Sequence, residues 1–381
     1  LLVIGCPGAL VISIPVAIVA GIGRAARNGI LIKGGEFLET SAKISAVAVD
    51  KTGTLTEGRP QLTDVIILDS TLDRPEVLRW AAAAEAGSEH PLARPILETA
   101  REEGVAPQGI PGTVTPVPGK GIVANVNGRQ VLIGNPPLLE QYGIASGIAE
   151  AAQAAQDLAA AGKTPMIVAV DETVIGVVAV ADQVRQDAPE MVARLHRAGV
   201  EKVVMLTGDT QLVAEAVGNA TGIDEIHASL LPEDKLDAVT ELQRQGHTIA
   251  MVGDGVNDAP ALATANIGVA MGAAGSAVAV ETADIALMGD NLLKLPEAIG
   301  LAKRTVNVMK QNIAIALVTV VLLLAGVFAG GVTMSIGMLV HEASVLVVIA
   351  NAMRLLRNTR YSTTTPKSER TIGTAAEQVA A

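Results

Sequence analysis

The stretch Asp50-Lys51-Thr52-Gly53-Thr54-Leu55-Thr56 decides how the rest of this chain is organised. It follows an apolar run at residues 46–49, and a short continuous apolar run of this kind predicts a buried strand. The Asp50 carboxylate would then lie at the carboxyl end of a strand, where open α/β sheets place their chemistry. Gly53 permits a tight turn there, and the threonine hydroxyls and backbone amides around it can surround phosphate oxygens. Asp50 is therefore a candidate nucleophile.

Two more polar clusters follow strand-like runs further along the chain. Residues 203–206 lead into Thr207-Gly208-Asp209, and residues 247–252 lead into Gly253-Asp254-Gly255-Val256-Asn257-Asp258. A helix is expected to begin at Lys235. This alternation of strands and helices predicts a parallel sheet with helices on both faces. Because the carboxyl ends of parallel strands meet at one edge, the three clusters are expected to form one active site.

Between residues 61 and 176 the pattern changes to β-prone runs and alanine-rich helices, which predicts an inserted α+β domain. Strands are expected at residues 121–126 and 130–133, because Asn127-Gly128 between them is a strong hairpin signal. The insertion also contains His90 and several paired glycines. Glycines let a backbone approach a purine or phosphate closely, and an imidazole can stack or hydrogen-bond. Spacing alone equally allows a helix start and ordinary turns.

Composition bounds the function classes. The 381 residues are half hydrophobic but only 1% aromatic, and the formal net charge is -11. Nucleic acid is excluded as an expected partner, since binding its phosphates requires basic patches. The single cysteine excludes a disulfide within the chain and fits a reducing cytosol around the soluble part.

Three stretches are long and apolar enough to be transmembrane helices, at residues 1–23, 312–332 and 333–351. Basic residues flank each of them on one side only, and the positive-inside rule then places all three flanks, with the large soluble portion, in the cytoplasm. The sequence thus predicts a multi-pass protein of the cell membrane, with the lipid bilayer as a partner. The tail at residues 358–381 is rich in Thr, Ser and Ala and is expected to be disordered.

The motifs point to one family. DKTGTLT at residues 50–56, together with GDGVNDAP at residues 253–260, resembles the signature of the P-type cation-pumping ATPases, and Cys6-Pro7-Gly8 is similar to the Cys-Pro element of their metal-transporting branch. The resemblance extends from Leu1 to about Arg357. In this family an actuator domain precedes the Cys-Pro span. No such sequence precedes Leu1, so the chain is expected to be a C-terminal fragment.

The resemblance implies a haloacid-dehalogenase-like, Rossmann-like α/β phosphorylation domain with an inserted α+β nucleotide-binding domain and three transmembrane helices. The expected domains are a connector at residues 24–45, the phosphorylation domain at 46–60 and 177–298, and the nucleotide-binding domain at 61–176.

ATP and Mg²⁺ are the implied cofactors. Asp50 would attack the γ-phosphorus, and Asp254 would hold magnesium jointly with the Asp50 carboxylate and the Thr52 carbonyl, since hard oxygen ligands suit that ion. Lys235 and Thr207 would contact the transferred phosphoryl group. Supporting positions around these residues would be Asn257 and Asp258. The family's nucleotide-contacting positions are matched by Glu85, His90, Gly119, Gly121, Gly134 and Asn135, and a family element at DxxR spacing is matched by Asp182 and Arg185.

A soluble phosphatase of the same fold is the alternative enzyme. Such phosphatases usually carry a second aspartate two residues after the nucleophile as general acid, and here that position is Thr52. Without a nearby acid or base, hydrolysis of an acyl phosphate should be slow, which suits a pump. A non-enzymatic scaffold or receptor would not require Asp50, Lys235 and Asp254 together.

The expected cargo is a divalent zinc, cadmium or cobalt ion. His341 and Glu342 lie within the third span, where ionisable residues are costly and suggest function, although they could serve only to hold helices together. Ser344 shares a helical face with His341. Cys6 could complete a mixed site whose ligands suit these metals better than copper(I), which prefers all-sulfur surroundings. A copper(I) pump remains the alternative, because the resemblance places Cys6 first in its triplet as in both zinc–cadmium and copper pumps.

Overall fold

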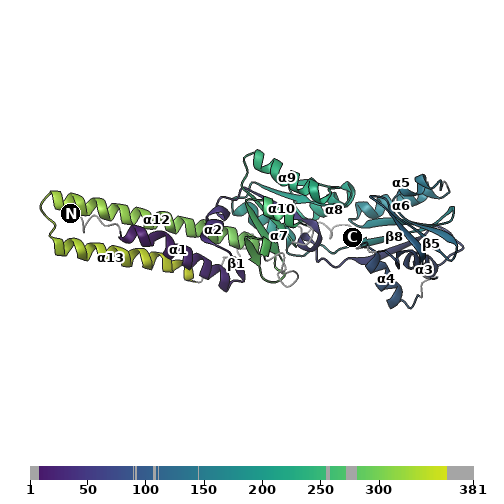
Figure 1. The fold of residues 1–381 in the computed structure, drawn as a ribbon, viewed down its shortest axis with the longest axis horizontal. Coiled ribbons are helices and arrows are strands. Elements are labelled where there is room, and N and C mark those ends of the chain that lie inside the picture. Colours follow the sequence, from purple (N-terminus) through teal and green to yellow (C-terminus); the bar gives the residue numbers. More distant parts are fainter. Residues whose placement is uncertain are drawn as a thin grey trace, which may run out of the picture.

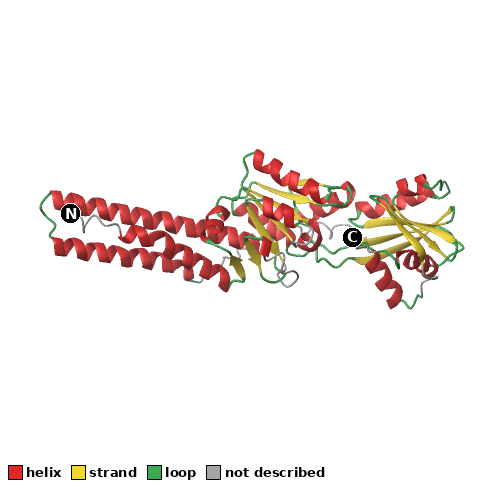
Figure 2. Cartoon of the chain, viewed as in Figure 1, coloured by secondary structure: helices red, strands yellow, loops and turns green. Residues whose placement is uncertain are grey.

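The computed structural model describes residues 8–88, 90, 92–105, 109, 111–144, 146–254, 258–271 and 281–357. The described chain is elongated and consists of three parts in a row (Figure 1). A bundle of long helices forms one end, a sheet with helices forms the middle, and a second sheet with helices forms the other end. Figure 2 shows that both sheets are covered by helices.

The middle part contains a seven-stranded sheet in the order β1-β13-β12-β11-β2-β9-β10. Its neighbouring strands pair in parallel, except that β1 pairs antiparallel with β13 at one edge. Strands β2, β11 and β12 are buried along their whole length, which explains their continuous apolar sequences. The strands are β1 (Ile30–Ile32), β2 (Ala46–Asp50), β9 (Lys202–Leu206), β10 (Glu225–His227), β11 (Ile249–Gly253), β12 (Ile267–Met271) and β13 (Ile285–Leu287).

Helices cover both faces of this sheet and form two separate apolar cores. One core buries Met191 and Leu195 of α7, and the other buries Val239 and Leu242 of α9. In both helices the buried side chains recur every three or four residues, as expected for amphipathic helices. The predicted doubly covered parallel sheet is therefore confirmed. Its helices are α2 (Gly35–Ser41), α7 (Ala188–Arg197), α8 (Gln211–Thr221), α9 (Pro232–Arg244) and α10 (Ala259–Thr264).

The second sheet is antiparallel throughout and has the order β3-β8-β7-β6-β5-β4. Asn127 and Gly128 both have positive φ, 54° and 82°, and form the predicted hairpin turn between β5 and β6. Helices α3 and α4 pack on one face and α6 on the other (Figure 1). The elements are β3 (Gln61–Ile67), α3 (Arg74–Glu85), α4 (Ala93–Glu102), β4 (Pro111–Val117), β5 (Gly121–Val126), β6 (Arg129–Gly134), α5 (Pro136–Gln141), α6 (Ile148–Ala160), β7 (Thr164–Val170) and β8 (Thr173–Ala181).

The return from the second sheet to the first comes later than the sequence suggested. Strand β8 pairs with β3 along its length and ends at Ala181, so the expected boundary between residues 176 and 177 falls inside a strand. The cause is an uninterrupted apolar run, which gives no signal before Asp182.

Within the described residues, three helices are long and apolar enough to cross a membrane: α1 (Gly8–Arg27), α12 (Lys294–Phe328) and α13, which spans Met334–Met353 and continues as a short 3₁₀ turn, Arg354–Leu356. Helix α12 begins far before the expected span at residues 312–332. Its first turns are part of the sheet's apolar core, where Leu295, Ala298 and Ala302 are buried. One continuous helix therefore connects the sheet to the bundle (Figure 1). The expected disordered tail at residues 358–381 lies outside the described residues.

Candidate active site

Asp50 is the last residue of β2, the strand between β11 and β9. Only 7% of its surface is exposed. The chain then turns sharply at Gly53, whose φ of +74° is in the left-handed region and favours glycine. Buried threonines follow, and the Thr54 hydroxyl has no hydrogen-bond partner within the described part of the chain. The carboxylate thus lies at the carboxyl edge of the sheet, as expected.

Lys235, from α9, reaches two carboxylates at this edge. Its Nζ donates to Asp50 Oδ1 at 2.6 Å and to Asp258 Oδ1 at 2.8 Å. All three side chains are largely shielded from solvent. The positive charge therefore lies where a transferred phosphoryl group would bring negative charge, and a preorganised cation of this kind is effective in a site with little water.

In this cluster, burial and repulsion between carboxylates oppose the attraction to Lys235. Burial and the neighbouring carboxylate of Asp258 raise the pKa of Asp50 from 3.8 to about 7, even though Lys235 opposes the shift. Burial alone would lower the pKa of Lys235, but attraction to Asp50 and Asp258 outweighs it and leaves that pKa raised. The lysine is therefore a permanent cation. Asp50 needs more positive charge near it to be fully ionised at neutral pH.

A second ion pair lies beside the first and was missed from the sequence. Lys51 Nζ contacts Asp209 Oδ2 at 2.6 Å, and the Thr207 hydroxyl donates to the same oxygen at 3.1 Å. These contacts join the turn after β2 to the turn after β9, which is its neighbour in the sheet. Lys51 and Asp209 lie inside the two motifs, but only the strand order shows that they meet.

Asp254 lies at the carboxyl end of β11 and faces the same turn. A methyl group added at Gly53 would lie 3.6 Å from Asp254 Oδ2. Within the described residues no group of three or more His, Cys, Asp or Glu side chains is placed to hold a metal, and Asp258 Oδ2 has no hydrogen-bond partner there. The carboxylates of Asp254 and Asp258 fit Mg²⁺, because this ion is usually held by one or two carboxylates together with substrate phosphates. Asn257 lies outside the described residues.

Asp182 and Arg185 hold the exit of the motif in place. Asp182 accepts hydrogen bonds from the Thr56 hydroxyl at 2.5 Å and from two backbone amides just beyond it. Arg185 Nε donates to the carbonyls of Thr54 and Thr56, both at 3.0 Å. Both side chains therefore tie the Asp50 turn to the chain as it leaves the second sheet. Their predicted contact with the nucleotide stays a prediction.

A family model for haloacid dehalogenase-like hydrolases matches residues 44–266, more than half of the chain. The chain belongs to the haloacid dehalogenase-like hydrolase family.

The matches with individual proteins are more specific. The chain is 42% identical over 357 residues to a probable cadmium-transporting ATPase of Staphylococcus aureus (strain MRSA252), covering 93% of this chain and 49% of that protein. The chain thus spans about half the length of the curated relatives it matches. The predicted resemblance to metal-transporting P-type ATPases is confirmed.

Solved structures agree. The crystal structure of a zinc-transporting PIB-type ATPase in the E2.Pi state matches with a TM-score of 0.73 and 42% identity, over 93% of this chain and 57% of that one. The catalytic domain of the CPx-ATPase CopB-B, from a study of changes on nucleotide binding, matches with a TM-score of 0.55 and 26% identity, over 73% of this chain and 98% of that one. The haloacid-dehalogenase-like fold with its insertion is therefore confirmed.

Within this P-type ATPase fold, the glycines of the second sheet are required by close backbone contacts. Gly121 of β5 is the register partner of Gly134 of β6. A methyl group on Gly121 would lie 2.1 Å from the Ile133 carbonyl oxygen of β6, and one on Gly134 would lie 2.1 Å from the carbonyl oxygen of Lys120, just before β5. Asn135 secures the same corner, because its Nδ2 donates to the Gly119 carbonyl at 3.0 Å and its Oδ1 accepts from the backbone of α5. The result is a glycine strip in which the backbones are in close contact, with the Leu138 side chain beside Gly134.

Glu85 and His90 lie at the end of α3 and just beyond it, and α3 packs on β5 and β6. Burial raises the pKa of Glu85, and its Oε2 has no hydrogen-bond partner within the described residues. Burial also lowers the pKa of His90. Both shifts favour neutral side chains, which can exchange hydrogen bonds with a neutral ring such as adenine.

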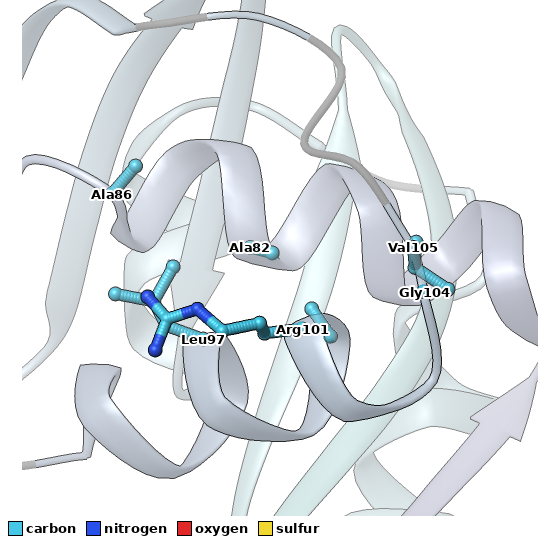
Figure 3. Close-up of a pocket in the computed structure, with 7 residues that line it drawn as sticks. Ala82, Ala86, Leu97, Arg101, Gly104 and Val105 are labelled. Carbon is cyan, nitrogen blue, oxygen red and sulfur yellow. The ribbon is translucent and has the colours of Figure 1, made fainter.

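A cavity in the second-sheet domain is separate from these residues. It has a volume of about 490 Å³, lies between α3 and α4, and contains a single charged side chain, Arg101. Figure 3 shows Arg101 extending along this groove beside Leu97. None of the predicted nucleotide residues lines the cavity, so it adds nothing to the nucleotide site. Its lining residues are Ala82, Ala86, Leu97, Ala100, Arg101, Gly104 and Val105.

The structure brings together part of the expected cargo site. Cys6 lies outside the described residues. His341 of α13 packs against the start of α1, since a methyl group on Gly8 would be 3.0 Å from its Nε2. The Ser344 hydroxyl is buried and donates to the His341 carbonyl at 2.6 Å. Glu342 is exposed on the outer surface of the three-helix bundle, away from these two residues.

Proposed function

We propose that this chain is the catalytic and C-terminal membrane part of an ATP-driven exporter of divalent metal ions that works through an aspartyl phosphate on Asp50. The observation that carries the proposal is the buried Asp50 carboxylate at the end of β2, held at 2.6 Å by Lys235, in a chain with three membrane-crossing helices. The soluble parts would lie in the cytoplasm and the helices in the cell membrane, in keeping with the basic flanks of the spans.

The chemistry is a phosphoryl transfer. A carboxylate oxygen of Asp50 attacks the γ-phosphorus of ATP, the bond to the β–γ bridging oxygen breaks, and ADP leaves. Lys235 neutralises charge on the transferred group, and Thr207 donates a hydrogen bond to it. Asp50, the Thr52 carbonyl and Asp254 would hold Mg²⁺, which supplies the positive charge that the raised pKa of Asp50 calls for.

The adenine would lie in the second-sheet domain, on the strip formed by Gly119, Gly121 and Gly134. The backbones are in close contact there and the Leu138 side chain lies beside Gly134, and Glu85, whose pKa is raised by burial, and His90 can recognise a ring edge. A titration of ATP into the isotopically labelled protein tests this assignment. Unshifted amide signals from the strip at millimolar nucleotide would remove it.

A phosphatase is the weaker alternative. The side chain two residues after Asp50 is the exposed hydroxyl of Thr52 rather than a carboxylate, so no acid at that position can activate water for rapid hydrolysis. The three membrane helices also have no role in a soluble phosphatase.

The phosphorylation step is tested with γ-labelled ATP and magnesium, an acid quench and treatment with hydroxylamine. We expect hydroxylamine-sensitive label in the wild-type chain and none in Asp50→Asn. The matched control is Asp157→Asn on the exposed face of α6, which should label as the wild type does. Label that persists in Asp50→Asn would exclude Asp50 as the acceptor.

The cargo we propose is zinc, cadmium or cobalt. Similar proteins named as cadmium- and zinc-transporting support this choice, as does the imidazole of His341 beside the helix start that follows Cys6. Mixed nitrogen, oxygen and sulfur ligands suit these ions better than copper(I). Glu342 would need to turn inward to contribute.

The test is the ATPase activity of the full-length protein against zinc, cadmium, cobalt, manganese and copper(I). We expect stimulation by the first three and loss of that stimulation in Cys6→Ala and His341→Ala. Stimulation by copper(I) alone, or unchanged responses in both variants, would reject this site.

A further inference from the structure

A buried polar contact joins all three membrane helices at one level. Asn312 of α12 donates through Nδ2 to the Ser13 carbonyl of α1 at 3.2 Å, and its Oδ1 accepts from Asn351 Nδ2 of α13 at 2.9 Å. Asn312 and Ser13 are both 0% exposed. We call Ser13, Asn312 and Asn351 the polar bridge.

The bridge is connected to the charged end of the bundle. Asn351 Nδ2 also donates to Gln311 Oε1 at 3.3 Å, and Arg354 Nη1 donates to Asn351 Oδ1 at 2.8 Å. Arg354 and Gln311 are exposed. Hydrogen bonds therefore run without a break from an exposed guanidinium in the 3₁₀ turn after α13, through Asn351 and Asn312, to a backbone carbonyl in the second turn of α1.

The position of the bridge along the helices is informative. Helix α12 begins in the apolar core of the seven-stranded sheet that carries Asp50. Asn312 lies two residues after Lys310, where the uncharged span begins. On α1 and α13, the bridge residues Ser13 and Asn351 lie on the cytoplasmic side of the contact between Gly8 and His341. The bridge therefore lies between the phosphorylation edge and the expected metal site.

We propose that Asn312 is a positioning residue. It couples the phosphorylation state of Asp50 to the positions of α1 and α13, and so to the metal ligands on these helices. This inference rests on the proposed function. A displacement of α12 at the sheet moves Asn312 with it, because the helix is continuous, and the two hydrogen bonds then move both partner helices. Coupling requires an element whose arrangement both sites can bias, and α12 shares an apolar core with β2 at one end and contacts α1 and α13 at the other.

The competing explanation is that the bridge only holds the three helices together. Single interhelical hydrogen bonds in membranes contribute modest stabilising energies on average. Replacing Asn312 by leucine keeps the approximate size of the side chain and leaves neither hydrogen-bond partner without a bond. Ser13 O remains within its helix, and Asn351 Nδ2 keeps its bond to Gln311. The variant is therefore expected to fold, and its effect on coupling can be separated from its effect on stability.

The sole cysteine, Cys6, lies two residues before the first described residue of α1 and can report on that helix. The full chain, in lipid nanodiscs, is labelled at Cys6 by a maleimide in the presence and absence of magnesium beryllium fluoride, a mimic of the phosphoryl group on Asp50. We expect the mimic to change the wild-type labelling rate at least fivefold. In Asn312→Leu and Asn351→Leu the ratio should fall below twofold, and the double variant should lose no more than either single variant.

Asn307→Leu is the matched control, because Asn307 is an exposed asparagine on the same helix outside the bridge; it should keep the wild-type ratio. The inference is overturned if Asn312→Leu keeps the ratio, if Asn307→Leu loses it equally, or if the wild type shows no response. Hydroxylamine-sensitive labelling of Asp50, measured on samples without beryllium fluoride, is expected to persist in Asn312→Leu. Its absence from the wild type would instead reject the proposed function.

Discussion

The edge at Asp50 and the glycine strip of the second sheet bind parts of one expected substrate in opposite ways. At the Asp50 edge, charged side chains from three strand ends are buried against one another, and Lys235 is shared between two carboxylates. At the strip, Gly121 and Gly134 remove side chains altogether so that two backbones touch. The first region depends on electrostatic interactions between charged side chains, and the second depends on close backbone packing. Mutations should therefore affect chemistry at one and binding at the other.

The largest effect is expected from Lys235→Met. It leaves the carboxylates of Asp50 and Asp258 buried without their cation, and breaking a buried pair in this way costs about 3–5 kcal/mol. Loss of a preorganised charge on the reacting group lowers rates by about 10²–10³. The initial rate of Asp50 phosphorylation at saturating ATP should fall by that factor, with little change in the ATP dissociation constant.

The matched control for this change is Lys163→Met, which breaks a half-exposed pair with Asp64 in the second-sheet domain. Phosphorylation should stay within about twofold of the wild type, since exposed pairs contribute about 0–1 kcal/mol. Equal losses in both variants would mean that Lys235 acts only through stability.

An intermediate effect is expected from Gly134→Ala. A methyl group would lie 2.1 Å from the Lys120 carbonyl and 2.7 Å from Leu138, so β5 and β6 must separate. Overpacking of this kind costs about 1–3 kcal/mol. ATP should bind at least tenfold more weakly, while the phosphorylation rate at saturating ATP should change little. Isothermal titration and single-turnover phosphorylation measure the two quantities.

Gly143→Ala controls for backbone strain without the clash. Gly143 has φ of +74° and nothing within 4 Å of the added methyl group, so only a left-handed penalty of about 1–2 kcal/mol applies. ATP affinity should be unchanged. If Gly143→Ala weakens ATP binding as much as Gly134→Ala does, the strip is not the binding surface.

The same contrast explains what the sequence could reveal. Asp50, Asp254 and Asp258 were predictable because strand-end clusters in a parallel sheet must meet at one edge, whereas Lys235, on a helix, was assigned from the family resemblance. The contact between Lys51 and Asp209 was missed because it depends on β9 lying next to β2, which no local pattern encodes. The pairing of Gly121 with Gly134 likewise depends on the register of two strands, although the Asn127-Gly128 turn fixes that register and could have indicated it.

The membrane region shows the limit of reasoning from spacing. His341 and Glu342 were expected to act together, but adjacent helical residues do not face each other, and the bundle covers only His341 and Ser344. Asn312 passed unnoticed in an apolar run, because its importance lies in Ser13 and Asn351, which are distant in sequence. Contacts among helices are set by packing, and a single sequence carries little signal for them.

The smallest effect tests whether charge at the Asp50 edge opposes folding, using Asp50→Asn without magnesium or nucleotide. Because the pKa of Asp50 is raised from 3.8 to about 7, the folded state holds a proton that the unfolded state releases between these pH values. Wild-type stability should therefore fall as pH rises through this window, whereas asparagine does not titrate.

Each pKa unit corresponds to about 1.4 kcal/mol, and the loss of a partner for Lys235 offsets part of the stability gained by Asp50→Asn. We expect Asp50→Asn to be more stable than the wild type by about 1–2 kcal/mol at pH 8, with the difference vanishing near pH 4. Thermal unfolding in detergent across this range measures the difference, with Asp157→Asn on the exposed face of α6 as the control. Magnesium should narrow the difference at pH 8 by stabilising the carboxylate. A lower melting temperature of Asp50→Asn than of the wild type at pH 8 would show that attraction to Lys235 outweighs the cost of burying the Asp50 carboxylate.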